Sequence, residues 1–397
     1  MKTSPFIILL IWSFSCKQAL EKTQPFIKGV YGNPATLLDA GYRFDSLGMN
    51  AVFVRSISLN REFYNTARQQ GAKVFVEFPT LNGKEYLQDH PEAWPITDKG
   101  KKAEPADWFM GICPTDPNFK NFREEQLKDI LGEFEVDGIF LDYVHWHAQF
   151  ETKNPILPET CFCDRCTGQF GESMRKKIPG DSAQHKAEWI LNHADKEWRN
   201  WRSGVLNGWV RDMGSVLHEI QPNAKLGVFY CSWYPTDYDS ALYRILGIDP
   251  KAFSEMADVM SPMLFHKMKE RPTTWVGDYV KWLGDLIGIR DMGSKSGDLN
   301  QRYKSEEQAD RSKPEDLNQG FNDVYKSKSE DLNYTQIWPI VQSHNSPDTV
   351  SPEEFRKVMI EGSRTPASGI MMFSDQSLVE NPNKINVMKK LYREEIN

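Results

Sequence analysis

Short apolar runs alternate with amphipathic stretches along most of the chain. The apolar runs are rich in β-branched and aromatic residues and have the length that is typical of buried strands. Eight such runs occur, at Phe26–Tyr31, Ala51–Val54, Val74–Phe78, Val136–Val144, Leu226–Tyr230, Val259–Phe265, Thr335–Val341 and Gly369–Phe373. Helical patterns occupy the intervals, at 35–47, 60–70, 119–134, 183–220, 241–257, 274–288, 352–362 and 383–395.

This alternation predicts a parallel sheet, and the count of eight favours a closed (β/α)8 TIM barrel of the α/β class. The alternative is an open doubly wound sheet, which normally has a Gly-rich phosphate loop after its first strand. The segment Val30–Pro34 does not have that pattern. We therefore predict a single barrel domain at 26–397, with extended βα loops.

Three long segments interrupt the predicted barrel, at 79–118, 148–182 and 290–331. We interpret them as insertions rather than independent domains. The third has eight Lys or Arg and ten Asp or Glu in 42 residues and only three aromatic ones, which predicts a charged mobile loop.

Composition narrows the class of protein. The chain has 397 residues, of which 40% are hydrophobic and 12% aromatic, which excludes a disordered protein. Its formal net charge of −7 argues against nucleic acid as a partner. Six cysteines are too few to replace a packed core, so hydrophobic burial must stabilise the fold.

The first sixteen residues have the pattern of an export signal. Lys2 precedes an apolar run at 5–14, and Cys16 follows the small residue Ser15. This arrangement resembles the lipobox of bacterial lipoproteins, with Cys16 as the lipid-modified residue; an ordinary secretory signal is the alternative. We expect a cell-envelope protein, at the outer membrane or on the periplasmic side. Its contact with the membrane should be through the lipid only, because no later run reaches about 18 apolar residues.

Candidate catalytic residues lie where the predicted strands end, the usual position of active sites in such barrels. Asp142 ends the otherwise apolar fourth strand, where an unpaired carboxylate is costly to bury, and is the first candidate. A structural carboxylate is the alternative. Glu77, in the third strand, is the second candidate, unless it pairs with Arg55 as a barrel-lining residue. The remaining catalytic candidates are Arg55, Tyr143, His145 and His266.

Aromatic residues at three strand ends suggest a sugar-binding site. Trp146, Trp233 and Trp338 follow three different strands, and flat indole faces can stack on sugar rings. Core packing is the alternative, since it accounts for most tryptophans. Further candidates for substrate binding are Tyr230, Asn33, Gln342 and Asp375.

A cysteine cluster predicts a metal site. Cys161, Cys163 and Cys166 lie within six residues, a spacing that suits a metal better than disulfides among themselves. The fourth ligand would be Cys113 or a histidine. We expect a structural zinc and no cofactor required for catalysis, because a closed site of thiolates leaves no open position. The alternative is a disulfide to Cys113, which an oxidising compartment would favour.

Several of these segments together resemble a known group of proteins. Asp137–Tyr143, followed by the Cys-x-Cys-x-x-Cys pattern and Phe170, resembles a group of bacterial glycoside-hydrolase-like barrel proteins. Further matching segments are Cys113–Pro117, Ser261–Met263 with His266, and Ile337–Gln342. The resemblance implies a (β/α)8 fold, an oligosaccharide substrate and a role in polysaccharide breakdown.

Three functions remain open at this point. A glycosidase needs two carboxyl groups beside the scissile bond, so Asp142 would require Glu77, Asp237 or Asp375 as its partner. A dehydratase or lyase acting on uronic-acid-containing oligosaccharides would instead use Arg55 to neutralise the uronate, with histidine and tyrosine as base and acid. A non-catalytic glycan-binding lipoprotein would not need the buried acids.

Overall fold

The computed structural model describes residues 25–289 and 335–396. The predicted signal with Cys16 and the charged insertion predicted at 290–331 lie outside the described residues. Within the described part of the chain, no helix is both long and apolar enough to cross a bilayer.

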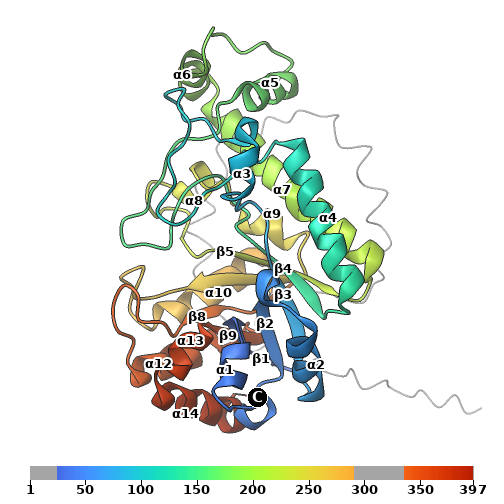
Figure 1. Cartoon of the computed structure of the whole chain (residues 1–397). Coiled ribbons are helices and arrows are strands. Elements are labelled where there is room, and N and C mark those ends of the chain that lie inside the picture. The colour runs from blue at the N-terminus through green and yellow to red at the C-terminus, as the bar shows by residue number, and fades with distance from the viewer. Residues whose placement is uncertain (1–24, 290–334, 397) are drawn as a thin grey trace, which may run out of the picture.

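A parallel sheet closes into a barrel at the centre of the molecule (Figure 1). Pairing between β5 and β6 completes the circle, which confirms the predicted (β/α)8 barrel. The strands are β1 (Ile27–Gly32), β2 (Ala51–Arg55), β3 (Lys73–Pro79), β4 (Gly138–Asp142), β5 (Lys225–Cys231), β6 (Val259–Leu264), β7 (Gln336–Ile337), β8 (Ile340–Gln342) and β9 (Gly369–Phe373).

The strands β7 and β8 share one position in the barrel, and both pair with β6. Trp338 and Pro339 separate them, and Pro339 has no backbone N–H to donate to a neighbouring strand. The nine strands therefore occupy eight positions, in the same places along the chain as the eight predicted runs.

Helices follow the strands around the barrel, as α1 (Ala35–Asp39), α2 (Arg61–Gln69), α3 (Tyr86–Asp89), α4 (Pro117–Glu133), α5 (Asp164–Ser173), α6 (Ala183–His193), α7 (Asp195–Ile220), α8 (Ala241–Arg244), α9 (Pro250–Ser254), α10 (Trp275–Ile287), α12 (Pro352–Gly362), α13 (Asp375–Val379) and α14 (Pro382–Lys390). The pattern predicted at 183–220 is two helices, α6 and α7, separated at Ala194. Helix α5 was not predicted; it starts at the cysteine cluster and lies with α6 at one end of the molecule, away from the strands (Figure 1).

Aromatic rings fill the interior of the barrel. Phe140 packs against Phe53, Phe75 and Trp338, with ring centroids 5.0 to 5.8 Å apart. This layer requires a glycine at 227, because a Cβ there would lie 2.3 Å from the Phe140 ring. The barrel is therefore closed by packed rings and has no open channel through this layer.

Polar side chains replace the aromatic layer two residues further along the same strands. Side chains on a strand alternate between the two faces, so Arg55, Glu77 and Asp142 follow Phe53, Phe75 and Phe140 on the inward face. Tyr31 of β1 joins them through its contact with Asp142. The sequence pattern thus changes from aromatic to ionisable at the carboxyl ends of β1 to β4, where a barrel site is expected.

Candidate active site

Asp142, the last residue of β4, is at the centre of this polar layer and is only 4% exposed. Its Oδ2 accepts a hydrogen bond from the Tyr31 hydroxyl at 3.1 Å, and its Oδ1 accepts one from the backbone N–H of Tyr143 at 2.8 Å. Burial raises the pKa of Asp142 to about 6, against the opposing effect of both hydrogen bonds. The carboxyl group is therefore mostly ionised at neutral pH but can still be protonated.

Glu77 is as buried as Asp142, with 4% exposure, but the two carboxyl groups differ in protonation state. Burial, and then the charge of Asp142, raise the pKa of Glu77 to about 8. Arg55 lies opposite Glu77 in the β2–β3 register, yet its side chain is exposed and its guanidinium carbon is 5.8 Å from the Phe373 ring centroid. Arg55 and Glu77 form no ion pair in the described structure, so Glu77 is mostly a neutral acid at pH 7.

Tyr143 follows Asp142 with a left-handed backbone, φ 56°, which is unfavourable for a non-glycine residue. Its ring stacks on Phe109, with centroids 5.4 Å apart, and meets Trp108 edge-on at 5.9 Å. Burial, and then the charge of Asp142, raise the pKa of Tyr143. The strained turn therefore directs the Tyr143 N–H to the Asp142 carboxylate while its ring packs on Phe109, and local strain of this kind collects at functional sites.

Glu151 is a third carboxyl group of this region, and sequence reasoning did not identify it. It lies half-buried in the long loop after β4, where its backbone N–H donates to Gln149 Oε1 at 2.7 Å. Burial, and then the charge of Asp142, raise the pKa of Glu151 to about 7, while Lys269 and Arg55 oppose this. The residue had no signal in the sequence because it follows no predicted strand directly. Its burial depends on how the loop folds.

The two candidate histidines are both buried and neutral. Burial lowers the pKa of His145 to about 4, and its Nδ1 lies 2.8 Å from the Trp146 carbonyl, so this nitrogen carries the proton. Burial likewise lowers the pKa of His266 to about 4. Neither ring nitrogen of His266 has a hydrogen-bond partner among the described residues. Both rings can accept a proton, but neither supplies a positive charge at neutral pH.

Three of the predicted sugar-binding residues lie inside the protein. Trp338 is 1% exposed in the aromatic layer, and its indole N–H donates to Ser368 Oγ at 3.1 Å. Trp146 is fully buried, and its indole N–H donates to the Arg202 carbonyl at 3.1 Å. Tyr230 is buried on the outward face of β5, on the strand face opposite to Phe229. An enclosed ring cannot stack on a sugar, so packing is the role that the structure gives these three residues.

Of the other four predicted binding residues, Asn33 is exposed, whereas Gln342, Asp375 and Trp233 are also buried. Gln342 uses its amide to hold three backbone groups, at Lys267, His344 and Ser346. Asp375 Oδ1 accepts a hydrogen bond from the backbone N–H of Asn33 at 2.9 Å, while the Asn33 side chain is exposed.

Trp233, the fourth of these residues, is 1% exposed and lies beneath Tyr238, with ring centroids 4.4 Å apart. Lys269 Nζ lies 4.8 Å from the Trp233 ring centroid and also donates to the Phe150 carbonyl at 2.6 Å. Trp233 therefore packs beneath the loop after β5, which carries Tyr238.

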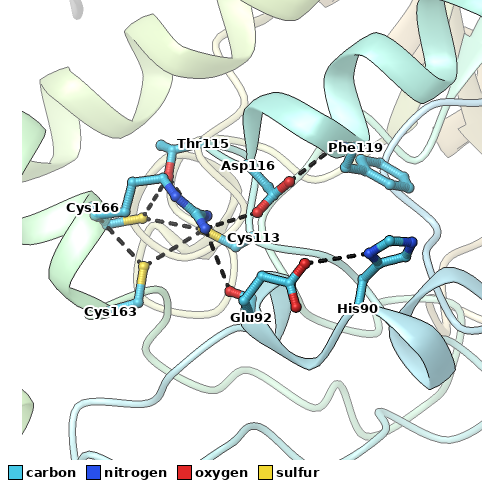
Figure 2. A network of polar contacts seen from close by, with 9 residues as sticks. His90, Glu92, Cys113, Thr115, Asp116, Phe119, Cys163 and Cys166 are labelled. Atoms are coloured by element: carbon cyan, nitrogen blue, oxygen red, sulfur yellow. Dashed lines mark hydrogen bonds and ion pairs between the residues drawn. The ribbon is translucent and has the colours of Figure 1, made fainter.

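The four predicted metal ligands come together from the loop after β3 and from the segment at the start of α5, and Figure 2 shows three of them, Cys113, Cys163 and Cys166. Cys113, from the loop after β3, lies 3.7 Å from Cys163 and 3.5 Å from Cys166 between Sγ atoms. All four Sγ atoms, including that of Cys161, lie within 4.8 Å of one another, and every sulfur but that of Cys163 belongs to a buried residue. A tetrahedral zinc with Zn–S bonds of about 2.3 Å separates its sulfurs by about 3.8 Å, which is close to these distances. None of the described cysteines forms a disulfide.

Hydrogen-bond donors surround the sulfur atoms. The backbone N–H groups of Ile96 and Cys166 donate to Cys161 Sγ at 3.2 Å and to Cys163 Sγ at 3.4 Å. Arg165 places a guanidinium nitrogen 3.6 Å from Cys113 Sγ and pairs with Asp116 at 2.8 Å, and Asp116 in turn caps the start of α4 (Figure 2). Such donors stabilise thiolates and orient metal ligands.

The overall structure is similar to those of several glycoside hydrolases. The PgaB (BpsB) glycoside hydrolase domain from Bordetella bronchiseptica has a TM-score of 0.60 and 11% identity, covering 94% of this chain and all of that one. The β-galactosidase from the psychrophilic Marinomonas ef1 has a TM-score of 0.56 and 11% identity, covering 92% of this chain and 59% of that one. A GH42 β-galactosidase from G. stearothermophilus has a TM-score of 0.55 and 12% identity, covering 92% and 57%.

No protein-family model matches the sequence, and no curated protein sequence matches it. At these identities the structural similarity establishes the fold alone, as a glycoside-hydrolase-like (β/α)8 barrel.

Proposed function

We propose that this protein is a carbohydrate-active enzyme that hydrolyses glycosidic bonds in oligosaccharides. The observation that carries the proposal is a group of buried carboxyls with different protonation states at the carboxyl ends of the strands. Asp142, with a pKa of about 6, is mostly ionised at neutral pH, whereas Glu77, with a pKa of about 8, is mostly protonated. Glycoside hydrolysis needs this combination of one carboxylate and one carboxylic acid.

The proposed roles follow from these protonation states. Asp142 acts as the carboxylate that attacks the anomeric carbon or activates a water molecule. A protonated carboxyl, Glu77 or Glu151, donates its proton to the glycosidic oxygen as the bond to the leaving sugar breaks. Glu77 lies deeper in the barrel and Glu151 lies in a half-buried loop, so Glu151 is the more accessible donor for a leaving group.

The test is the mass of the product after incubation with oligosaccharides. Hydrolysis adds one water in total to the products, whereas dehydration removes one and eliminative cleavage adds none. Asp142→Asn should lower turnover by at least about a hundredfold with the fold intact, the lower end for a positioned acid–base group. Asp137→Asn is the matched control, because Asp137 precedes the same strand at the opposite end of the barrel and its Oδ2 accepts from the Val74 N–H at 2.8 Å.

The results also separate the two other functions. A water-loss product, or an unsaturated uronate that absorbs in the ultraviolet, would replace hydrolysis with the dehydratase or lyase function. Binding without any mass change would leave a glycan-binding lipoprotein. Near-normal turnover in Asp142→Asn would remove Asp142 from the reaction and leave it a structural carboxylate.

A second proposal concerns the cysteine cluster. We propose that Cys113, Cys161, Cys163 and Cys166 hold a structural zinc ion that ties the loop after β3 to the start of α5. The support is the set of four sulfurs within 4.8 Å, with backbone donors to two of them. Four thiolates leave no open coordination position, so this zinc would stabilise the loops and take no part in the reaction.

Metal analysis of the purified protein tests this second proposal. About one equivalent of zinc is expected, with loss of the metal and lower thermal stability in Cys113→Ser, because metal binding energy contributes to folding. Cys231→Ser is the matched control, since Cys231 is buried but lies outside the cluster. Metal-free protein, with the four cysteines titratable as thiols or joined as disulfides, would overturn it.

A further inference from the structure

In the described part of the chain, two of the exposed aromatic side chains lie in loops beside the candidate active site. Within the described residues, the exposed aromatic rings are those of Trp108, Phe122 and Tyr238, with exposures of 43%, 37% and 42%. Phe122 lies on the outer helix α4. Trp108 lies in the loop after β3, and Tyr238 lies in the loop after β5.

The two strands that precede these loops flank the strand that ends at Asp142. In the sheet, β4 lies between β3 and β5 and pairs with both (Figure 1). Asp142 ends β4, so the loop that carries Trp108 and the loop that carries Tyr238 leave the barrel on either side of the carboxylate.

Trp108 is connected to the site by direct ring contacts. Its ring meets Phe109 edge-on at 6.0 Å and Tyr143 edge-on at 5.9 Å between centroids. Tyr143 is the residue that follows Asp142 and donates its backbone N–H to that carboxylate. One edge of Trp108 is thus held by the site while the side chain as a whole remains accessible to solvent.

Tyr238 is supported from below in a similar way. Its ring lies 4.4 Å from the buried Trp233 between centroids, and Lys269 lies on Trp233 at 4.8 Å. The buried Trp233 and Lys269 thus support one face of the Tyr238 ring, while the side chain remains partly exposed to solvent. A ring fixed by packing loses little conformational entropy when it binds a ligand.

Backbone strain is concentrated in the same loops. Seven non-glycine residues in the described structure have positive φ, and five of them are Asp107, Tyr143, Tyr238, Asp239 and Ser240. Asp107 directly precedes Trp108. Left-handed conformations in such residues cost of order 1 kcal/mol or more each and persist where the surrounding structure needs them. The strain is an observation independent of exposure, and it points to the same two rings and to the turn at Asp142.

We propose that Trp108 and Tyr238 form an aromatic clamp that binds sugar rings on the two sides of Asp142. The clamp rests on the proposed function, because it assumes that an oligosaccharide occupies the mouth of the barrel. Its ligand is a chain of at least two sugar units, whose apolar ring faces stack on Trp108 and Tyr238 while the linkage between them lies at Asp142. The clamp takes the stacking role that the sequence assigned to Trp146, Trp233 and Trp338, which are all at most 1% exposed.

The experiment measures glycan binding in a protein whose turnover is strongly reduced. Asp142→Asn serves as the host, and the probes are neutral and uronate-containing oligosaccharides displayed on a carbohydrate microarray. The best probe is then titrated in solution against the host and against the host with Trp108→Ala or Tyr238→Ala. Each substitution should weaken binding by about tenfold, the order expected for losing one aromatic face.

Two further variants distinguish stacking from a structural effect. Trp108→Phe keeps an aromatic face and should retain most of the affinity. Phe122→Ala removes an exposed ring of similar exposure on α4 and should leave affinity unchanged. Equal loss in Phe122→Ala, or no rescue by Trp108→Phe, would overturn the clamp.

The remaining outcomes separate the clamp from the proposed function. If the host binds an oligosaccharide and both alanine variants bind it equally well, the clamp is refuted and the proposed function stands. If the host binds no oligosaccharide and the wild type hydrolyses none, the proposed function is refuted and the clamp with it.

Discussion

Replacing Glu77 by glutamine would show whether this carboxyl is buried without a compensating charge. Glutamine keeps the shape of the side chain and removes the titration. The pKa of Glu77 is raised from 4.5 to about 8 by burial and then by the charge of Asp142, so the folded state holds this proton more tightly than the unfolded state does. The stabilising contribution of the protonated group is therefore complete below about pH 4.5 and is lost as the pH rises to about 8.

The size of the effect follows from the same two values. One pH unit corresponds to roughly 1.4 kcal/mol, so ionising Glu77 in the folded protein costs up to roughly 5 kcal/mol. This is an upper bound, because the barrel mouth can relax or admit water when the charge forms. Glu77→Gln should remove this cost, and its free energy of unfolding should rise relative to wild type between about pH 5 and pH 9.

The assay is urea unfolding of both proteins at these two pH values. Equal m-values for the two proteins are the control, since they show that the same surface is exposed on unfolding. A difference in unfolding free energy that is the same at both pH values would show that Glu77 does not change its protonation state between them. A variant that is less stable at both would mean that Glu77 is ionised and paired with Arg55, which is the alternative that the sequence left open.

Three further predictions concern the reaction, the core and the anchor. Turnover should fall below about pH 6 as Asp142 is protonated. It should also fall as the proton donor ionises, above about pH 7 if the donor is Glu151 and above about pH 8 if the donor is Glu77. Removing the true donor, by Glu151→Gln or Glu77→Gln, should abolish this alkaline limb in a pH–rate profile, and a limb that survives both substitutions would exclude both as donors. Trp338→Ala should cost about 3–5 kcal/mol in chemical denaturation, because it empties the aromatic layer, and a much smaller loss would contradict a core role. Cys16→Ser should release the protein from membranes in a fractionation experiment, and unchanged membrane attachment and mobility would contradict the lipobox.

The (β/α)8 fold could be predicted from the sequence because its signal is local. Each strand is a short apolar run, and buried parallel strands are apolar on both faces, as in Ile139–Leu141. Asp142 and Glu77 could also be identified from the sequence, since a carboxyl group in an otherwise apolar strand is chemically unusual. The three closely spaced cysteines were visible for the same reason.

Other assignments required distances across the fold. Trp146, Trp233 and Trp338 have similar positions after predicted strands. In the structure, Trp233 packs against the exposed Tyr238, whereas Trp146 and Trp338 pack in the interior. The sequence placed Cys113 only as one option for the fourth ligand, because its distance of 3.5 Å from Cys166 spans two loops.

By itself, the sequence determined where the strands lie, which carboxyls and thiols are available, and that the chain forms a barrel. These properties depend on the period of the apolar positions and on the chemistry of single side chains. Only the tertiary structure decided that Glu151 is half-buried with a raised pKa, that Arg55 forms no ion pair with Glu77 among the described residues, and that Trp108 is exposed beside Tyr143. The physical reason is that burial, pairing and pKa depend on distances between residues far apart in the chain, and long loops set those distances through contacts that no local pattern encodes.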